Sequence, residues 1–131
     1  MVGKNNPFNI RWNPRNQWKG LSQNPVNKGF CNFKDIKFGI RAAAYLLIVS
    51  YRKKGIKTYG EIIKRFAPPF ENDTDKYIQF VCDSMKVFPF DGPTTRIRYA
   101  HLLHYMSIYE GNRVEVFDIF EVIHLFNLKL K

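Results

Sequence analysis

Two glutamates of this chain stand where a carboxyl group could act as an acid. Glu71 follows "APPF", residues 67–70, in which two prolines restrict the backbone and so limit where the glutamate side chain points. A carboxylate held beside Phe66 and Phe70 would have its pKa raised by desolvation, as a general acid at neutral pH requires. The alternative is a solvated loop glutamate near the start of a helix.

Glu110 is the second candidate, at the end of the basic and aromatic segment "RIRYAHLLHYMSIYE", residues 96–110. A negative charge at the C-terminus of a helix opposes the helix macrodipole and is mildly unfavourable there. Residues that break a local rule gather at functional sites, so this conflict indicates a use for Glu110. The alternative is an exposed and screened side chain.

The other carboxylates are few, since Asp and Glu total only 11, and most have a structural explanation. Glu61 completes a capping box with Thr58, and Asp73 and Thr74 are expected to cap the following helix. Asp73 nevertheless lies two residues from Glu71 and is a candidate second carboxylate for it.

The histidines and cysteines predict neither a metal site nor a cofactor. His101 and His104 share a helix face, but no carboxylate or cysteine stands nearby in sequence to complete a ligand set. Cys31 and Cys82 are expected to be free, buried thiols, with a single disulfide between them as the alternative. The chain also lacks a glycine-rich phosphate loop, a CxxC pair and an HExxH motif.

Composition and charge fit one domain over residues 1–131 with an anionic partner. The chain is 45% hydrophobic and 16% aromatic, so it can bury a core, and some of its rings could instead line a groove and stack on a sugar or base. A net charge of +10 favours nucleic acid, anionic lipid or bacterial cell wall. Because the basic residues are scattered along the chain, we expect a general positive field rather than a surface that reads a nucleic-acid sequence. The net charge is the only feature that supports nucleic-acid binding.

The sequence also bears on where the protein acts. The start, "MVGKNNPFN", has no apolar signal-peptide region, and the longest apolar run, residues 42–49, is too short to cross a bilayer. We therefore expect synthesis in a bacterial cytoplasm without a signal peptide, no transmembrane segment, and action at the cell wall or in a virion after delivery by other means.

The elements that must position these residues are mainly helical. Residues 1–29 hold much of the Asn, Pro and Gly and predict loops, with one short strand around 8–12 that pairs with 29–33 in a small hairpin. Apolar periodicity and capping residues then predict five helices: 35–55, 58–66, 74–87, 94–110 and 114–126. The expected fold class is mainly α, or α+β, with a small N-terminal β-hairpin.

Two motifs together resemble a known family. "NNPFNIR", residues 5–11, resembles the N-N-P-G-N-I/L-R signature of small phage and prophage proteins, a family that includes virion structural proteins and lysozyme-like peptidoglycan-degrading domains. "RFAPPFENDTDKYI", residues 65–78, matches the family pattern R-W/Y-A-P-P-x-E-N-x-T-x-x-Y almost residue for residue. Phe8 departs from the usual glycine of the first motif.

Shorter pieces extend the resemblance over about residues 5–112. They include the W-x-G of Trp18 and Gly20, the F-x-x-F-like "GFCNF" at 29–33, and the G-I-R-A of residues 39–42. "MSIYEGN", residues 106–112, is similar to a helix that closes on an E-N-G-like turn, although the order here is E-G-N.

The resemblance implies a helical, lysozyme-like domain that binds or cleaves bacterial cell-wall glycan. In related glucosaminidases and transglycosylases a catalytic glutamate ends a helix, and a hairpin with an N-x-x-x-I-R/K-like motif follows it and lines the cleft. Here the corresponding motif precedes the Glu110 helix, as in a permuted order.

The leading expectation is therefore a muramidase or lytic transglycosylase acting on the β-1,4 bond between N-acetylmuramic acid and N-acetylglucosamine. Glu71 or Glu110 would protonate the glycosidic oxygen, with Asp73 as a possible second carboxylate. Without a second carboxylate, a transglycosylase that uses the 6-hydroxyl of the substrate becomes the better interpretation. The alternative is a non-catalytic virion or cell-wall-binding protein with the same fold.

The same interpretation assigns the substrate contacts and partners. Amide and guanidinium groups would bind N-acetyl and hydroxyl groups, and two aromatic rings would serve as sugar platforms. The partners would be peptidoglycan and, in a virion or at lysis, other phage proteins. The residues expected to bind substrate are Asn5, Asn6, Asn9, Arg11, Trp18, Arg41, Asn72 and Tyr77.

Overall fold

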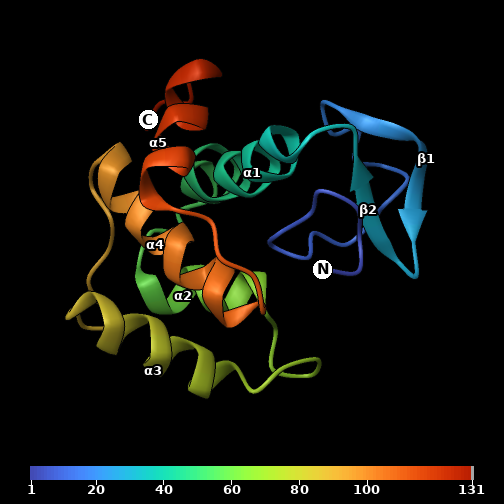
Figure 1. The fold of residues 1–131 in the computed structure, drawn as a ribbon. Helices are drawn as coiled ribbons and strands as arrows, with labels where there is room; N and C mark the ends of the chain where they lie inside the picture. The colour runs from blue at the N-terminus through green and yellow to red at the C-terminus, as the bar shows by residue number, and fades with distance from the viewer. Residues whose placement is uncertain (131) are drawn as a thin grey trace.

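A computed structural model describes residues 1–130 as a helical body with a small β-hairpin beside it (Figure 1). The expected mainly helical fold with five helices and an N-terminal hairpin is confirmed. In chain order the elements are β1 (Leu21–Asn27), β2 (Phe30–Phe33), α1 (Ile36–Tyr45), the π-helical turn η1 (Leu46–Tyr51), α2 (Tyr59–Phe66), α3 (Thr74–Met85), α4 (Arg96–Tyr109) and α5 (Val116–Leu125).

The hairpin pairs β1 with β2 in antiparallel register, with Leu21 opposite Phe33 and Val26 opposite Cys31. Its turn is Lys28–Gly29, and both residues have positive φ, 49° and 87°. Two consecutive residues with positive φ give the turn a twist that matches the twist of the strands.

The expected strand at 8–12 is wrong as the first strand of this hairpin. Residues 10–12 do lie beside β2, because the Cys31 amide donates to the Ile10 carbonyl at 3.0 Å, but they form only one isolated bridge, between Arg11 and Phe30. Asn5 and Asn9 have left-handed backbones, with φ of 56° and 53°, which prevents a continuous extended strand.

The helix starts follow the capping residues, with one correction. The capping box of Thr58 and Glu61 opens α2, and Thr95 caps α4. The cap of α3 is Asp73, whose carboxylate accepts from the Lys76 amide at 3.3 Å, and not Thr74. Thr74 is the first helical residue, and its hydroxyl donates to the Ala67 carbonyl.

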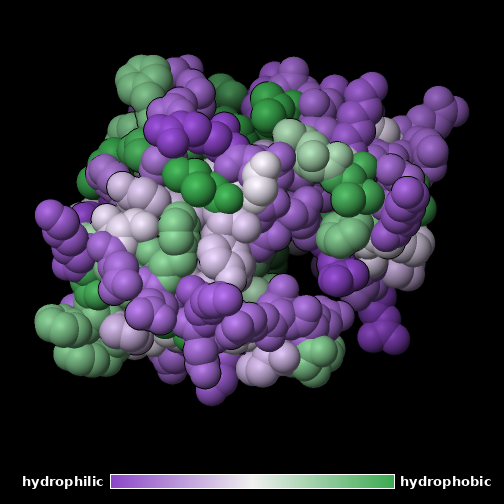
Figure 2. Space-filling view, turned by 60° about the horizontal axis from the view of Figure 1, so that its bottom comes forward, coloured by the Kyte–Doolittle hydropathy of each residue, from purple (hydrophilic) through white to green (hydrophobic). Residues whose placement is uncertain are grey.

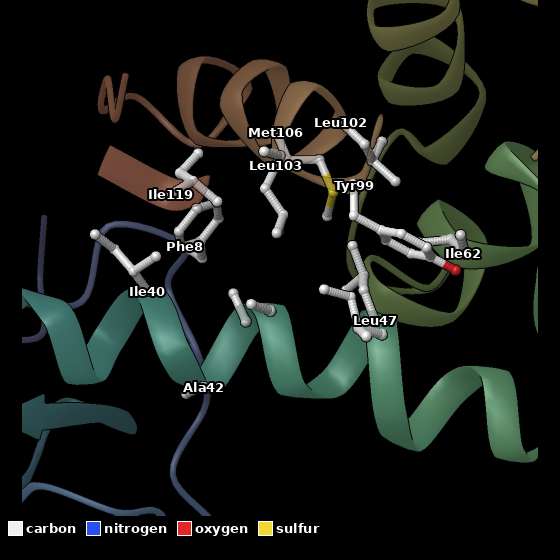
Figure 3. Close-up of a cluster of buried hydrophobic side chains, with 14 of the residues drawn as sticks. Phe8, Ile40, Ala42, Leu47, Ile62, Tyr99, Leu102, Leu103, Met106 and Ile119 are labelled. Atoms are coloured by element: carbon white, nitrogen blue, oxygen red, sulfur yellow. The ribbon is translucent and has the colours of Figure 1, made fainter. Parts of the chain in front are cut away.

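The core forms around α1, which packs against α4 and α5 (Figure 3). Ala43 of α1 and Leu103 and Met106 of α4 are fully buried in this core. Phe8 comes from the N-terminal segment and inserts its ring between α1 and α4, where its exposed fraction is 0%. Phe8 thus anchors the polar opening of the chain to the helical body.

Gly39 lets the N-terminal segment approach α1 closely. A Cβ atom at this position would overlap the carbonyl oxygen of Asn5. The "NNPFNIR" and "GIRA" motifs therefore contact each other. Glycine is required at position 39 because a larger side chain would collide with the N-terminal segment, and not because of its backbone conformation.

The cysteines and histidines have structural places. Cys31 and Cys82 are free and buried, as expected, and burial raises the pKa of the Cys31 thiol to about 11. His104 is buried with its Nδ1 atom 2.7 Å from the Val114 carbonyl oxygen. Within residues 1–130, no group of three or more His, Cys, Asp or Glu side chains could hold a metal ion, and no helix is long and apolar enough to cross a membrane.

Candidate active site

A cleft of about 550 Å³ lies between the N-terminal segment with its hairpin and the helical body. Figure 2 shows the surface hollowed to the right of centre, between the larger body and the smaller one. Amides, aromatic rings, two glutamates and two arginines surround this space. The lining residues are Asn9, Ile10, Arg11, Trp12, Asn13, Asn16, Trp18, Phe30, Leu46, Tyr51, Arg65, Phe66, Ala67, Pro68, Glu71, Asn72 and Glu110.

Glu110 is held at the cleft by the end of α4. It is the C-cap of that helix, and Gly111 follows with a φ of 88°, a left-handed conformation that suits glycine. The Asn112 amide bonds back to the Ser107 carbonyl at 2.9 Å, which closes the last turn. The Asn112 side chain donates to the Pro7 carbonyl at 2.9 Å, so the E-G-N order ties the helix end to the N-terminal segment.

The carboxyl group of Glu110 has a partner from the opposite side of the cleft. Asn9 Nδ2 donates to Glu110 Oε1 at 2.9 Å and also to the Glu110 carbonyl oxygen at 3.2 Å. Burial raises the pKa of Glu110, while the hydrogen bonds from Asn9 and Tyr77 and the charge of Arg11 oppose the rise without cancelling it. The group therefore keeps a proton at higher pH than an ordinary glutamate.

Tyr77 supports Glu110 from the interior. Its ring is 1% exposed and stacks on Tyr109 with a centroid distance of 4.0 Å. Its hydroxyl donates to the Met106 carbonyl at 3.4 Å and also lies close enough to the Glu110 carboxyl to lower the pKa of that group. Because the ring is covered, the expectation that Tyr77 is a sugar platform is wrong.

Glu71 lines the cleft on the loop between α2 and α3, and its Oε2 atom lies 3.6 Å from Arg11 Nε. The side chain is exposed, and Phe70 is 84% exposed, so the expected apolar enclosure of the Glu71 carboxylate does not form. Asp73 is absent from the cleft lining and caps α3 instead. It is therefore not placed as a second carboxylate.

The asparagines expected to bind substrate divide into two groups. Asn6 is fully buried, with its Nδ2 donating to the Ile10 and Cys31 carbonyls and its Oδ1 accepting from the Ile10 amide, so it holds the loop together. Asn5 donates from Nδ2 to the Phe33 carbonyl at 3.0 Å and is absent from the cleft lining. Asn72 does line the cleft and is exposed.

Aromatic rings form much of the cleft wall. Trp18, an expected platform, lines it and packs edge-on against Tyr45 at 6.2 Å between ring centroids. Trp12 and Phe30 line it as well, and the guanidinium of Arg11 lies 4.9 Å from the centre of the Phe30 ring. Trp12 directly follows the "NNPFNIR" motif, so the sequence could have indicated it.

Tyr51 and Arg65 also line the cleft, and sequence reasoning did not select them. Burial raises the pKa of Tyr51 to about 12, with the charge of Arg65 acting in the opposite direction. Both residues lie in ordinary helical patterns, Tyr51 at the end of η1 and Arg65 in the last turn of α2, and only the tertiary fold brings them to the cleft.

Arg41, expected to bind substrate, is outside the main cleft and lines a smaller neighbouring pocket of about 340 Å³. Its guanidinium lies over the rings of Tyr45 and Phe126, at 5.1 and 5.5 Å from the ring centres. Burial lowers the pKa of Arg41 from its usual value.

This arrangement suits proton donation to a polar ligand. A half-buried carboxyl group with a raised pKa faces a cleft walled by amides and aromatic rings, which are the groups that bind sugars. Of the residues that line the cleft, Glu71 and Glu110 are the carboxylates. Glu110 is half-buried with a raised pKa, whereas Glu71 is exposed beside Arg11.

Comparison with known proteins places the chain near one phage protein. No family model matches it. Over 81 residues, 60% of the chain, it is 40% identical to Protein P5 of Pseudoalteromonas phage PM2. The matched stretch is 51% of that protein, so the chain spans about half the length of the curated relative it matches. The similarity indicates a bacteriophage origin for this chain.

Proposed function

We propose that the protein cleaves the glycan strands of peptidoglycan, with Glu110 as the general acid. The observation that carries the proposal is the environment of the Glu110 carboxyl. It is half-buried at the end of α4, hydrogen-bonded by Asn9 across the cleft, and has a raised pKa. A glycosidase needs an acid of this kind, because the leaving sugar must receive a proton as the glycosidic bond breaks.

The reaction begins when the Glu110 carboxyl donates its proton to the oxygen that links two sugars. The bond between that oxygen and C1 of N-acetylmuramic acid breaks, and positive charge develops on the C1 ring. A nucleophilic hydroxyl then forms the new C1–O bond, and its proton passes to a carboxylate. The Glu110 carboxylate, which has just lost its proton, is placed to accept it.

The nucleophile is either water or the 6-hydroxyl of the same sugar. Water gives a reducing end, whereas the 6-hydroxyl gives a 1,6-anhydro product that is one water lighter. Glu71 also lines the cleft, but it forms an ion pair with Arg11, with 3.6 Å between Glu71 Oε2 and Arg11 Nε. Because Arg11 already lies against the Glu71 carboxylate, Glu71 is less available as a second catalytic group, which favours the intramolecular route that needs Glu110 alone.

The test is release of soluble muropeptides from purified peptidoglycan, with mass spectrometry to distinguish the two products. Glu110→Gln should lower the rate by about 10²- to 10⁴-fold, because it removes the proton donor and keeps the shape. Glu71→Gln should have a much smaller effect if the route is intramolecular. Glu121→Gln, on the exposed face of α5, is the matched control. Wild-type rates in the Glu110 variant would refute the assignment.

A second candidate function is non-catalytic binding of the cell wall within a phage particle. The pairing of Glu71 with Arg11 favours it, because no unpaired second carboxylate lines the cleft. The similarity to a phage protein is compatible with association with other virion or lysis proteins. Co-sedimentation of the wild-type protein with cell walls, without release of muropeptides, would select this function.

A further inference from the structure

The smaller pocket adjoins the cleft. The two spaces share Asn16, Trp18 and Leu46 as common walls. The smaller one is completed by Arg15, Gln17, Arg41, Tyr45 and Ser50. A ligand in the main cleft can therefore extend a substituent into a pocket lined by two arginines and no carboxylate.

Arg41 holds its charge there without an acidic partner. Neither of the ion pairs found in residues 1–130 involves it. Its Nε atom is buried and has no hydrogen-bond acceptor. Aromatic rings of Tyr45 and Phe126 lie against the guanidinium and limit its movement. A fixed guanidinium with an unused donor is suited to bidentate binding of a planar oxyanion.

Trp18 adds a second unused donor to the same pocket. Its indole Nε1 atom is also buried and without an acceptor. Buried donors are almost always hydrogen-bonded in folded proteins, so two such donors around one pocket call for an explanation. The outer nitrogens of the Arg41 guanidinium are not among the covered atoms, and they are the donors that a ligand acceptor in the pocket can reach.

We propose that this pocket is an anionic subsite that binds a carboxylate carried by the glycan in the neighbouring cleft. The inference rests on the proposed function, and it identifies the substrate as an acidic rather than a neutral glycan. In peptidoglycan every second sugar carries a lactyl group, which ends in a free carboxylate or continues into a peptide that has carboxylates of its own. In both cases the pocket would bind a carboxylate that is carried by a substituent of the sugar ring.

Binding is measured by calorimetry in the Glu110→Gln background, so that no ligand is cleaved. The three probes are a neutral N-acetylglucosamine oligomer, peptide-free glycan strands with lactyl carboxylates, and strands that carry peptides. The subsite requires tighter binding of at least one acidic probe than of the neutral oligomer. Preference for peptide-free or peptide-bearing strands identifies which carboxylate enters the pocket.

Variants of the arginines then test the assignment. Arg41→Gln should weaken binding of the preferred acidic probe by about 10- to 100-fold, as expected for loss of charge-assisted hydrogen bonds, and leave the neutral oligomer unchanged. Arg15→Gln, at an exposed position outside the core, should weaken the same probe by several-fold. Lys54→Gln removes one charge outside both spaces and controls for the general positive field.

Equal binding of acidic and neutral probes by the parent protein, or an unchanged preference in both arginine variants, would overturn the proposal. A loss of equal size in Lys54→Gln would overturn it too, because attraction by net charge would then explain the preference. Failure of the proposed function gives a different result. If the wild-type protein cleaves nothing but shows the Arg41-dependent preference, the proposed function is refuted and the subsite is supported. If the wild-type protein cleaves peptidoglycan and Arg41→Gln binds every probe as tightly as its parent does, only the subsite is refuted.

Discussion

Replacing Asn9 with glycine tests whether the N-terminal segment controls the acid. Glycine accepts the left-handed backbone of this position, where φ is 53°, and removes the side chain that bonds Glu110. The change deletes one hydrogen bond to a carboxylate, worth about 1.5–3 kcal/mol when the group is ionised, and one to a carbonyl, worth about 0.5–1.5 kcal/mol. Because Asn9 Oδ1 is itself buried without a partner, its removal offsets part of the loss. We expect a net cost of about 2 kcal/mol at a pH high enough to ionise Glu110.

The cost should depend on pH, since protonation of Glu110 turns the charged acceptor into a neutral one. Near pH 4 the penalty of Asn9→Gly should therefore fall by about 1 kcal/mol. Loss of the bond should also raise the pKa of Glu110 further, because this bond opposes the rise caused by burial. If Glu110 is the acid, the alkaline limb of the pH–rate profile shifts to higher pH.

Urea denaturation followed by tryptophan fluorescence measures the penalty at the two pH values. Asn5→Gly is the matched control, because Asn5 has the same left-handed backbone, with φ of 56°, and donates to the neutral carbonyl of Phe33. Its penalty should not change with pH. Asn9→Ala should cost about 1 kcal/mol more than Asn9→Gly, from the left-handed backbone alone. Equal pH dependence in Asn9→Gly and Asn5→Gly would refute the reasoning.

Three further outcomes follow from the same contacts. Phe8→Ala should lower the free energy of unfolding by about 3–5 kcal/mol in urea titrations, because the ring is fully buried between α1 and α4, and a loss below 1 kcal/mol would contradict that role. In Glu110→Gln the effect on stability should depend on pH. The raised pKa means that wild-type stability is full below the pKa of the unfolded chain and falls as pH rises through that of the folded protein, so the variant gains relative to wild type over the pH range above the ordinary glutamate pKa. A constant difference across that range would argue against burial of the charge. Gly39→Ala should displace the N-terminal segment, because its Cβ would overlap the Asn5 carbonyl, and should speed amide exchange in residues 5–11 while α3 is unaffected.

The helices could be predicted from the sequence because their signals are local. Thr58, Glu61 and Thr95 cap helices where the sequence places them, since a cap needs only a few neighbouring residues. The prediction fails where tertiary contacts compete with local signals. Residues 8–12 look like a strand, but the left-handed backbone of Asn9 and the burial of Phe8 leave a loop with a single bridge to β2.

The candidate site could be predicted in part. Glu110 was identified by its conflict with the helix dipole, and Asn9 and Arg11 by their motif, and all three line the cleft. Side-chain direction could not be predicted, because it depends on residues distant in sequence. Asn6 and Tyr77 have the types expected of ligand contacts, yet one bonds the backbone of its own loop and the other lies under Glu110.

The sequence by itself determined a small, basic, mainly helical domain with few carboxylates. Composition is read directly from the sequence, and apolar periodicity and helix caps each depend on only a few neighbouring residues. Only the tertiary structure decided which of the two glutamates is half-buried and which is exposed. Glu71 and Glu110 are alike in isolation, but Arg11 lies beside the first in solvent, whereas Asn9, 101 residues away in sequence, meets the second where burial raises its pKa. The pKa of a carboxyl group depends on the water it loses and the charges it meets, and folding sets both.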